Sequence, residues 1–248
     1  MILSRRNLLI GGGATLLAGC DKLNNSSGFR EALRGGERLT MKAQRLISSR
    51  EAMAREFSAA DMSPVFRSNG TGNPDTPDYN RLAAGRFAEW RLGVDGLVRR
   101  PLALTLAQLQ IMPRRTQITR HDCVEGWSAI GKWTGVPLSI ILDGAGLRDE
   151  ARYIVFHCMD RYGDRPYYES IDLIDAFHPQ TILAWGLNDQ ILPVANGAPL
   201  RLRVERQLGY KQAKYIARIE ARATLAGLYG GNGGTWEDSN DYEWYAGI

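Results

Sequence analysis

The sequence predicts an α+β fold of mixed element order in which β-structure dominates. Short apolar and β-branched runs bounded by turn-forming residues recur along most of the chain. Helical periodicity is confined to fewer segments, and neither a regular βαβ alternation nor an internal repeat is evident. The expected strands lie at residues 87–95, 101–106, 116–120, 153–158, 166–172, 182–187, 200–204 and 214–225, and the expected helices at 37–57, 105–111, 137–144 and 170–176.

The composition favours one folded catalytic domain. With 248 residues and 44% hydrophobic composition, the chain can bury a substantial core, since domains typically contain about 50–250 residues. Aromatic residues at 9% and charged residues at 23% exclude wholesale disorder. The formal net charge is +4, and the sequence contains no RNA-binding motif and no dense run of Lys and Arg. We therefore expect no nucleic-acid partner.

The first twenty residues carry the features of an export signal. Residues 4–9 read Ser-Arg-Arg-Asn-Leu-Leu, and an apolar stretch diluted by glycine then leads to Leu17-Ala18-Gly19-Cys20. This pattern resembles a twin-arginine signal joined to a lipoprotein cleavage box. The apolar stretch is about a dozen residues long, whereas a membrane-spanning helix needs roughly 20, so a permanent span is the weaker alternative. We predict a signal at residues 1–19, a lipid anchor at Cys20 and a location on the periplasmic side of the cytoplasmic membrane.

Residues 20–36 are predicted to form a tether and residues 37–59 an amphipathic helix that packs on the following domain, residues 60–248. Asn and Ser are frequent directly after Cys20, which suits a linker. The arginines of residues 30–55 fit a solvated helix face, with proximity to anionic lipid as the alternative. The apolar positions of the expected helix are Leu39, Ala43, Leu46, Ile47, Met53, Ala54 and Phe57.

Two cysteines, Cys123 and Cys158, remain once Cys20 is assigned to the lipid anchor. In an oxidising compartment these two could form a disulfide, which is the structural alternative to a reactive role. Neither belongs to a Cys-x-x-Cys pair, so the usual sequence signatures of iron–sulfur clusters, zinc ribbons and c-type haem are missing.

A dense group of reactive side chains follows the expected strand at residues 116–120. It contains a thiol, an imidazole, two carboxylates and an indole within ten residues, which is more than a core needs. Three interpretations are open: a buried structural cysteine, a nucleophilic Cys–His pair, and a metal-bound thiolate. The residues concerned are His121, Asp122, Cys123, Glu125 and Trp127.

Two later segments have the composition of anion sites. Residues 196–203 read Asn-Gly-Ala-Pro-Leu-Arg-Leu-Arg, and a strand there directs Arg201 and Arg203 to one face. Two guanidiniums on one face can hold a phosphate or a carboxylate, and a solvated strand face is the alternative. Residues 209–215 read Gly-Tyr-Lys-Gln-Ala-Lys-Tyr and offer successive backbone amides with two ammonium groups. The glycine-rich segment 230–236 lacks a phosphate-loop pattern and is better explained by turns.

These three clusters, in this order, resemble the sulfite-oxidase superfamily of molybdopterin enzymes, in its periplasmic haem-free branch. In that branch the metal thiolate lies in a Cys-Val-Glu-Ala-Trp-Ser-like run, and residues 123–128 differ from it only at Gly126. Gly135-Val136-Pro137-Leu138 follows, as the family's Gly-x-Pro-Leu does. The resemblance covers roughly residues 60–248. It implies a β-dominated molybdopterin-binding fold.

The resemblance also implies the cofactor and its ligands. One molybdenum with a single molybdopterin would be bound by the Cys123 thiolate, with His121, Asp122, Glu125 and Trp127 around the metal. The family's Asn-Gly-Ala-Pro-x-Arg and Gly-Tyr/Phe-Lys-x-x-Lys runs imply five further cofactor-binding residues, namely Asn196, Arg201, Gln212, Ala213 and Lys214.

Two more cofactor contacts rest on looser matches. Residues 66–70 resemble the family's Arg-Asn cofactor loop and imply Asn69. Cys158 stands where the related methionine-sulfoxide reductases have a threonine that contacts the pterin. A role for Cys158 near the cofactor and a buried structural thiol are both open.

The activity implied by the resemblance is two-electron oxygen-atom transfer on a small-molecule substrate, with electrons exchanged with a separate carrier such as a membrane cytochrome. Sulfite oxidases follow the metal cysteine with an arginine-bearing run, whereas Glu125 and Trp127 stand here, so we expect sulfite to be a poor substrate. A sulfite dehydrogenase, a thiol enzyme using Cys123 with His121, and a non-catalytic lipoprotein binding module are the alternatives. The sequence shows neither an immunoglobulin-like dimerisation domain nor a b-type haem domain, so we expect a monomer.

Overall fold

The computed structural model describes residues 26–248, which divide after Ser48 into two units. The predicted signal at residues 1–19 and the predicted lipid-anchor residue Cys20 lie outside the described residues. Within residues 26–248, no helix combines the length and the apolar character needed to cross a membrane.

The first unit consists of helix α2 (Ser27–Ile47). The helix begins after Ser26, whose hydroxyl oxygen accepts a hydrogen bond from the N–H of Phe29 at 3.4 Å. The predicted bounds of this helix, residues 37–59, are therefore wrong, and so is the assignment of all of residues 20–36 to a tether. The N-cap starts the helix within the expected tether, and the helix ends well before residue 59.

The residues expected to form the second half of that helix belong to the second unit and are not helical. The N–H of Ala54 donates to the side-chain oxygen of Gln180 at 2.7 Å, and the N–H of Phe57 donates to the carbonyl of Ile118 at 2.9 Å. Because these partners already satisfy its backbone groups, the segment gains nothing from helical hydrogen bonds.

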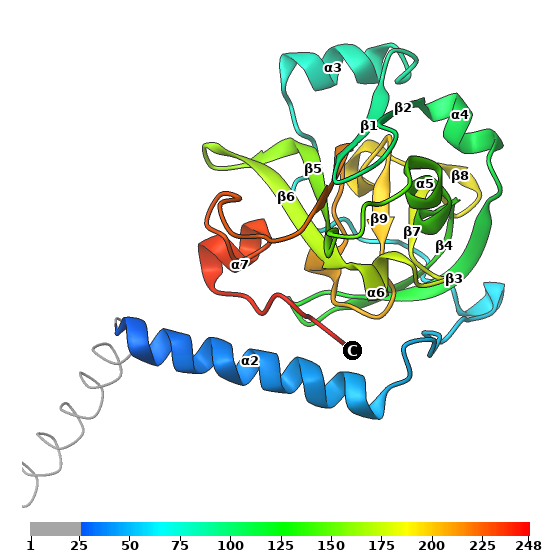
Figure 1. Cartoon of the computed structure of the whole chain (residues 1–248). Coiled ribbons are helices and arrows are strands. Elements are labelled where there is room, and N and C mark those ends of the chain that lie inside the picture. The colour runs from blue at the N-terminus through cyan, green and yellow to red at the C-terminus, as the bar shows by residue number, and fades with distance from the viewer. Residues whose placement is uncertain (1–25) are drawn as a thin grey trace, which may run out of the picture. The chain divides into compact units, whose positions relative to one another are not determined.

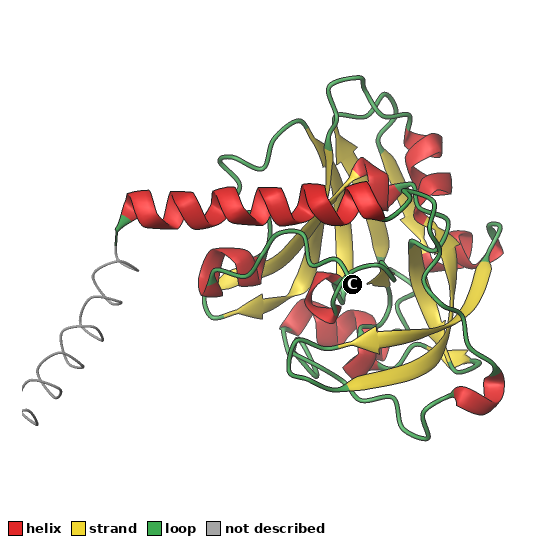
Figure 2. Ribbon diagram, turned by 90° about the horizontal axis from the view of Figure 1, so that it is seen from below, coloured by secondary structure: helices red, strands yellow, loops and turns green. Residues whose placement is uncertain are grey.

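Two sheets form the framework of the second unit (Figures 1 and 2). The first has the strand order β2-β1-β10-β5-β6 and contains a parallel β1–β10 pair. The second has the order β3-β4-β7-β8, with β9 also paired to β7, and its pairs are antiparallel. The strands are β1 (Arg91–Gly96), β2 (Leu102–Thr105), β3 (Arg115–Asp122), β4 (Ser128–Pro137), β5 (Tyr153–Tyr162), β6 (Arg165–Asp172), β7 (Ile182–Leu187), β8 (Gln190–Ile191), β9 (Arg201–Arg203) and β10 (Ile216–Arg222).

Short helices connect these strands. The prediction of an α+β fold in which β-structure dominates is confirmed. Each expected strand overlaps an observed one, but β4 and β8 were not predicted, and residues 170–172 belong to β6 rather than to a helix. The remaining elements are η1 (Ala59–Asp61), α3 (Pro77–Ala84), α4 (Leu106–Ile111), α5 (Leu138–Ala145), α6 (Leu173–Ala176), η2 (Val194–Asn196), η3 (Gly209–Lys211) and α7 (Thr235–Asn240).

A continuous apolar core joins the two sheets. Leu92 and Ile219 of the first sheet and Leu183 of the second are fully buried in it. Helix α5 contributes one apolar face to the same core. A smaller cluster surrounds Trp133 of β4, whose ring lies beneath two arginine side chains described below. Burial of these side chains is the main favourable contribution to folding, at roughly 25 cal/mol per Å² of apolar surface.

The segment after β10 returns to pack against both the first sheet and η3. The N–H of Tyr168 in β6 donates to the hydroxyl of Thr235 in α7 at 2.9 Å. Further along, the N–H of Leu208 donates to the carbonyl of Ala246 at 2.9 Å. The expected turns are present at residues 230–234, where Gly231 and Gly233 have positive φ angles, whereas residues 235 and 236 begin helix α7.

Candidate functional site

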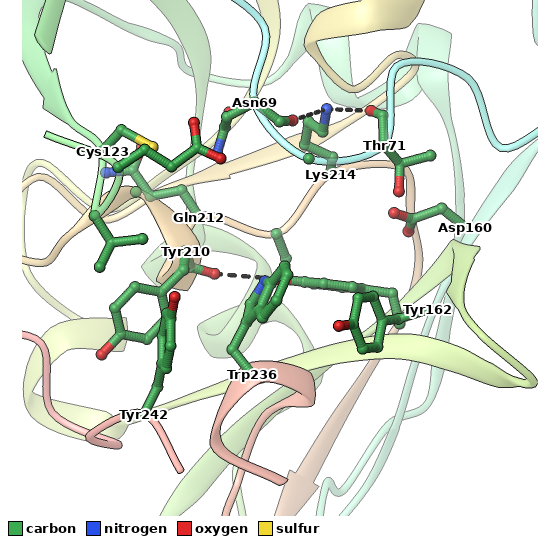
Figure 3. A pocket seen from close by; sticks show the side chains of 16 residues that line it. Asn69, Thr71, Cys123, Asp160, Tyr162, Tyr210, Gln212, Lys214, Trp236 and Tyr242 are labelled. Carbon is green, nitrogen blue, oxygen red and sulfur yellow. Dashed lines mark hydrogen bonds between the residues drawn. The ribbon is translucent and has the colours of Figure 1, made fainter. Parts of the chain in front are cut away.

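A cavity of about 270 Å³ opens beside the end of β3 (Figure 3). Its walls come from five parts of the chain: the loop at residues 69–71, the turn at residues 123–125, the β5–β6 hairpin, the segment at residues 209–214, and the α7 region. Six of the residues singled out in the sequence line it, namely Asn69, Cys123, Glu125, Gln212, Ala213 and Lys214.

Cys123 occupies a tight turn directly after β3. Its N–H donates to the carbonyl of Trp127 at 2.9 Å, and its carbonyl accepts from the N–H of Gly126 at 3.0 Å. Gly126 has a φ of 86°, a conformation that favours glycine, and this turn directs the Cys123 sulfur toward the cavity (Figure 3). Burial raises the pKa of the Cys123 thiol, so a metal ion would be needed to hold it as a thiolate. Cys123 and Cys158 are both free, which rules out the disulfide alternative.

His121 is fully buried and supports the cavity from behind rather than lining it. Its Nδ1 lies 3.2 Å from the side-chain oxygen of Gln212 and 3.1 Å from Nη1 of Arg203. Burial and the charges of Arg201 and Arg203 hold the pKa of His121 well below its usual range. Among the described residues no hydrogen bond joins His121 to Cys123, so the nucleophilic pair is not assembled.

Of the other three candidates near Cys123, only Glu125 lines the cavity. Glu125 lines the cavity and accepts a hydrogen bond from the indole N–H of Trp127 at 3.0 Å. Trp127 is not a lining residue and stacks beneath the guanidinium of Arg67 at 5.3 Å. Asp122 is also outside the lining, since it pairs with Arg120 and accepts from the hydroxyl of Ser128.

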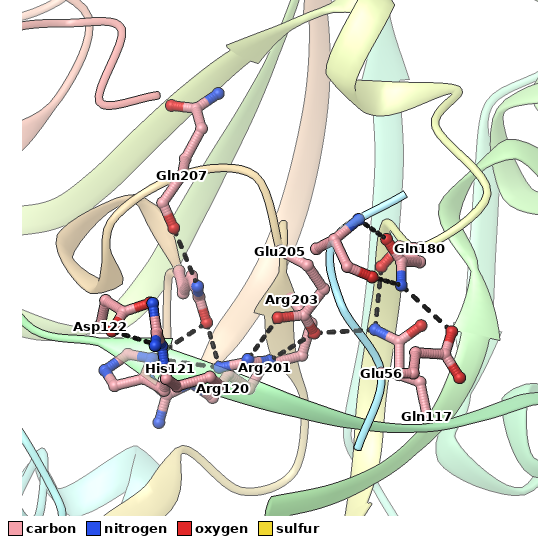
Figure 4. Close-up of polar contacts among 12 residues, drawn as sticks. Glu56, Gln117, Arg120, His121, Asp122, Gln180, Arg201, Arg203, Glu205 and Gln207 are labelled. Carbon is pink, nitrogen blue, oxygen red and sulfur yellow. Dashed lines mark hydrogen bonds and ion pairs between the residues drawn. The ribbon is translucent and has the colours of Figure 1, made fainter. Parts of the chain in front are cut away.

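The two arginines of β9 have different surroundings (Figure 4). Arg203 pairs with the buried carboxylate of Glu205, so its charge is already neutralised. Arg201 is also fully buried, and its Nη atoms donate to the carbonyl of Asn196 at 3.1 Å and the side-chain oxygen of Asn69 at 3.3 Å. Burial lowers the pKa of Arg201 to about 9. The alternative of a solvated strand face is therefore wrong for both arginines, and the carboxylate that Arg203 holds belongs to the chain itself.

Unpaired donors gather around Arg201. Among the described residues, Nε of Arg201 and the side-chain nitrogen of Asn196 are buried without a hydrogen-bond partner. Such donors are rare in folded proteins, because an unmade buried hydrogen bond costs about 1–3 kcal/mol. Both residues lie behind the cavity lining. Arg201 donates to the side chain of the lining residue Asn69, and Asn196 follows Ala195, whose carbonyl accepts from the lining residue Lys214.

Lys214 is the cation of the cavity wall. Its Nζ donates to the carbonyls of Asn69 at 2.6 Å, Ala195 at 3.0 Å, and Thr71. Burial and the nearby Arg201 lower the pKa of Lys214 to about 7. Together with the unpaired donors, it makes this wall suited to an anionic group such as a phosphate.

Lys211, the second ammonium expected to hold an anion, faces away from the cavity. It contacts Glu169 and Glu237, and all three side chains are fully buried. Burial raises the pKa of Glu169 well above its usual range, with the neighbouring Glu237 adding to the effect and Lys211 opposing it. The expectation for Lys211 is therefore wrong, because its charge is already matched by carboxylates.

The structure places Cys158 outside the lining, with its sulfur 4.0 Å from the carbonyl of Phe156. It also brings in lining residues that the sequence did not single out. These come mainly from the β5–β6 hairpin and from the aromatic, acidic segment near α7, and they are Asp160, Tyr162, Tyr167, Tyr210, Trp236 and Tyr242. The one usable signal was the density of aromatic residues after residue 235.

Residues 80–227 match the family described as "Oxidoreductase molybdopterin binding domain". The chain belongs to this family. Members of this molybdopterin-binding family bind molybdenum through molybdopterin, and the chain is a molybdenum-dependent oxidoreductase of the sulfite-oxidase superfamily. The residues present fit that cofactor, since the Cys123 thiol and the Lys214 ammonium line one cavity and the unpaired nitrogens of Arg201 and Asn196 lie behind its lining.

Two relatives of the molybdopterin-binding family are similar to this chain. The first, named as protein-methionine-sulfoxide reductase subunit YedZ1 of Azospira oryzae, is 36% identical over 95% of this chain and 83% of its own length. The second, protein-methionine-sulfoxide reductase catalytic subunit MsrP of Ralstonia nicotianae, is 38% identical over 62% of this chain and 49% of its own length. The sulfane dehydrogenase SoxCD of Paracoccus pantotrophus shares the fold, with a TM-score of 0.50 and 23% identity over 55% of this chain and 39% of that chain.

Proposed function

We propose that this enzyme carries out oxygen-atom transfer by reducing an S-oxide or N-oxide to the corresponding sulfide or amine. The reaction consumes two electrons and two protons and releases water. The molybdenum, bound by one molybdopterin and the Cys123 thiolate, supplies the two-electron chemistry. The protein holds the cofactor with Arg201 and Lys214 and shapes the substrate pocket with Glu125.

The single observation that carries this proposal is the charge beside Cys123. Val124 and Glu125 line the cavity there, and a carboxylate repels a sulfite dianion. The two arginines that might have compensated do not line the cavity: Arg120 pairs with Asp122, and Arg161 donates to the carbonyl of Asp164. A neutral, dipolar S-oxide suits this environment, because it needs no cationic partner.

The names of the relatives support the same direction of reaction. Both are protein-methionine-sulfoxide reductase subunits, so methionine sulfoxide, free and within a protein, is the first substrate to test. We infer that the electrons come from a separate carrier, a membrane cytochrome.

The deciding experiment compares the two directions with the molybdenum-loaded full chain. With reduced viologen as donor, we expect turnover of methionine sulfoxide, dimethyl sulfoxide or an amine oxide. With cytochrome c or ferricyanide as acceptor, we expect kcat/KM for sulfite oxidation to be at least about 100-fold lower than kcat/KM for the reduction of the best oxide. This ratio corresponds to about 2.7 kcal/mol of transition-state free energy. Efficient sulfite oxidation with no turnover of oxides would make the enzyme a sulfite dehydrogenase.

We further propose twin-arginine export and lipid anchoring on the periplasmic side of the cytoplasmic membrane, supported by Arg5-Arg6 and by the run ending at Cys20. Replacing both arginines by Lys should leave unprocessed precursor in the cytoplasm, and Cys20→Ala should block lipidation. Cell fractionation with labelled fatty acid checks both. Normal membrane delivery of the double-Lys precursor would exclude the twin-arginine route.

A further inference from the structure

Helix α2 is amphipathic, and its large apolar side chains are exposed. On a helix with 3.6 residues per turn, one face carries Phe29, Leu33, Leu39, Leu46 and Ile47. Each of these residues has between 38% and 87% of its surface exposed. A continuous apolar stripe of this kind on a polar helix marks an interaction site.

The opposite face of α2 is basic. Arg34, Arg38 and Lys42 recur at every fourth position and are exposed. The helix contains five basic and two acidic residues among its 21, so its net charge is positive. A helix with one apolar face and so many charges on the other suits the plane of a bilayer surface rather than the hydrocarbon interior.

The two ends of α2 also suit a helix bound at a surface. At its start, the helix begins seven residues after Cys20, the proposed acylation site. At its end, only Ser48 separates the helix from the second unit. The carbonyls of Ser49 and Arg50 there accept hydrogen bonds from Nη1 of Arg206, at 3.2 and 2.6 Å. Because little free chain remains on either side, a helix bound to lipid would keep the start of the second unit close to the bilayer.

An anionic lipid surface has the chemistry that both faces need. The acyl region accepts the apolar side chains, and each Lys or Arg near the headgroups raises affinity by about fivefold. A groove on a protein could cover the apolar face equally well, but it would not require the other face to be basic. We propose that α2 lies in the surface of an anionic bilayer, with its apolar face in the lipid and its basic face among the headgroups, independently of acylation at Cys20.

The first test measures partitioning onto vesicles made of equal parts of phosphatidylcholine and phosphatidylglycerol. Every sample is the full, cofactor-loaded chain with Cys20→Ala, so no acyl group contributes and the rest of the N-terminus is common to all variants. Leu39→Gln with Leu46→Gln should lower the partition coefficient by at least about tenfold. The matched control is Ile111→Gln with Ile191→Gln, which removes two similarly exposed apolar side chains from the second unit and should partition like the parent chain.

The second test examines the basic face. Arg34→Gln, Arg38→Gln and Lys42→Gln together should lower partitioning onto the mixed vesicles by about 100-fold. The same triple variant should bind to vesicles of pure phosphatidylcholine as the parent chain does, because these vesicles carry no net charge. Glutamine is a good helix former, so both sets of variants keep the helix.

Spin labels report the depth of each face. They are attached through Leu33→Cys on the apolar face and Arg38→Cys on the basic face, in the same Cys20→Ala chain. On mixed vesicles the first label should collide mainly with oxygen, which concentrates in the acyl region, and the second with a water-soluble nickel complex. Cys123 and Cys158 are buried, and the parent chain labelled in parallel corrects for any label that they take up.

Folding is followed by thermal melting, and no variant should melt lower than the parent chain, because the replaced side chains are exposed. Unchanged partitioning with a lowered melting temperature for Leu39→Gln with Leu46→Gln would assign the apolar face to a protein contact and overturn the proposal. Equal partitioning of the parent and both sets of α2 variants would also overturn it, as would an equal fall in the control pair. Weaker partitioning of both α2 sets, with the two labels at different depths, would establish it.

None of these outcomes depends on acylation, which cell fractionation tests separately.

Discussion

Lys211 should contribute several kilocalories per mole to the stability of the fold, and the size of that contribution should depend on pH. Its ammonium serves two carboxylates, Glu169 and Glu237, and all three side chains have no exposed surface. In Lys211→Met the two carboxylates would remain buried without a cation. Removing one partner of a buried ion pair typically costs about 3–5 kcal/mol.

The pH dependence follows from the sign of the carboxyl pKa. Burial raises the pKa of Glu169 above its unfolded value even with Lys211 present, and removal of Lys211 raises it further. A carboxyl with a raised folded pKa holds a proton that the unfolded chain releases, so stability falls as pH rises above the unfolded pKa, near 4.3. The loss is larger in Lys211→Met, because the pKa of Glu169 is raised further there, and it amounts to about 1.4 kcal/mol for each pH unit by which the raised pKa in the variant exceeds that in wild type.

Urea denaturation of the cofactor-free protein, followed by tryptophan fluorescence, measures this loss. We expect Lys211→Met to be less stable than wild type by about 3–5 kcal/mol at pH 7.5 and by no more than about 1 kcal/mol at pH 4.5. Lys132→Met is the matched control, because Lys132 pairs with Asp189 at 2.8 Å with 30% and 66% of the side chains exposed. Such a surface pair contributes about 0–1 kcal/mol. An equal loss for Lys211→Met at both pH values would refute the reasoning.

Three further predictions concern the cofactor site. Cys123→Ser should abolish redox activity and the thiolate-to-molybdenum absorption, whereas Cys158→Ser, outside the cavity lining, should keep both; an unchanged Cys123→Ser spectrum would contradict the assignment. Gly209→Ala should lower the melting temperature and the molybdenum content, because a Cβ there would lie 2.4 Å from Cε1 of the buried His121, and overpacking costs about 1–3 kcal/mol. Because the pKa of Lys214 is lowered to about 7, cofactor binding above pH 7 requires this lysine to take up a proton. The affinity for the cofactor should therefore fall by up to about tenfold per pH unit between pH 7 and 9. Cofactor retention that does not change over this pH range would exclude a role for the Lys214 ammonium in binding.

The sequence predicted the parts of the fold in which local pattern and tertiary structure agree. Strand β4 was missed because Gly131 and Gly135 dilute its alternating pattern, and glycine is normally unfavourable in strands. The structure explains both: a Cβ at Gly135 would lie 2.3 Å from the carbonyl of Leu183, and one at Gly131 would lie 2.7 Å from the ring of Phe66. Close packing between distant segments selects these glycines, and such contacts leave no local signal.

The candidate site, like the fold, could be predicted from the sequence only in part. The resemblance to a known family singled out Cys123, Gln212 and Lys214, which line one cavity although they lie far apart in the sequence. Lys211 was misjudged because a lysine looks the same in sequence whether it faces a ligand or two buried carboxylates. Asp160 was missed because its buried place in the cavity wall exists only in the folded chain.

The positions of the lining residues Trp236 and Tyr242 in the chain determine the order in which the cavity can be completed. A nascent chain that has passed Lys214 already contains the thiol and the donors, but Trp236 and Tyr242 have yet to be synthesised. The backbone contact between Leu208 and Ala246 forms later still. The full set of walls therefore exists only after translation has passed this segment, so the walls that carry the thiol and the lysine are made before the cavity can be completed.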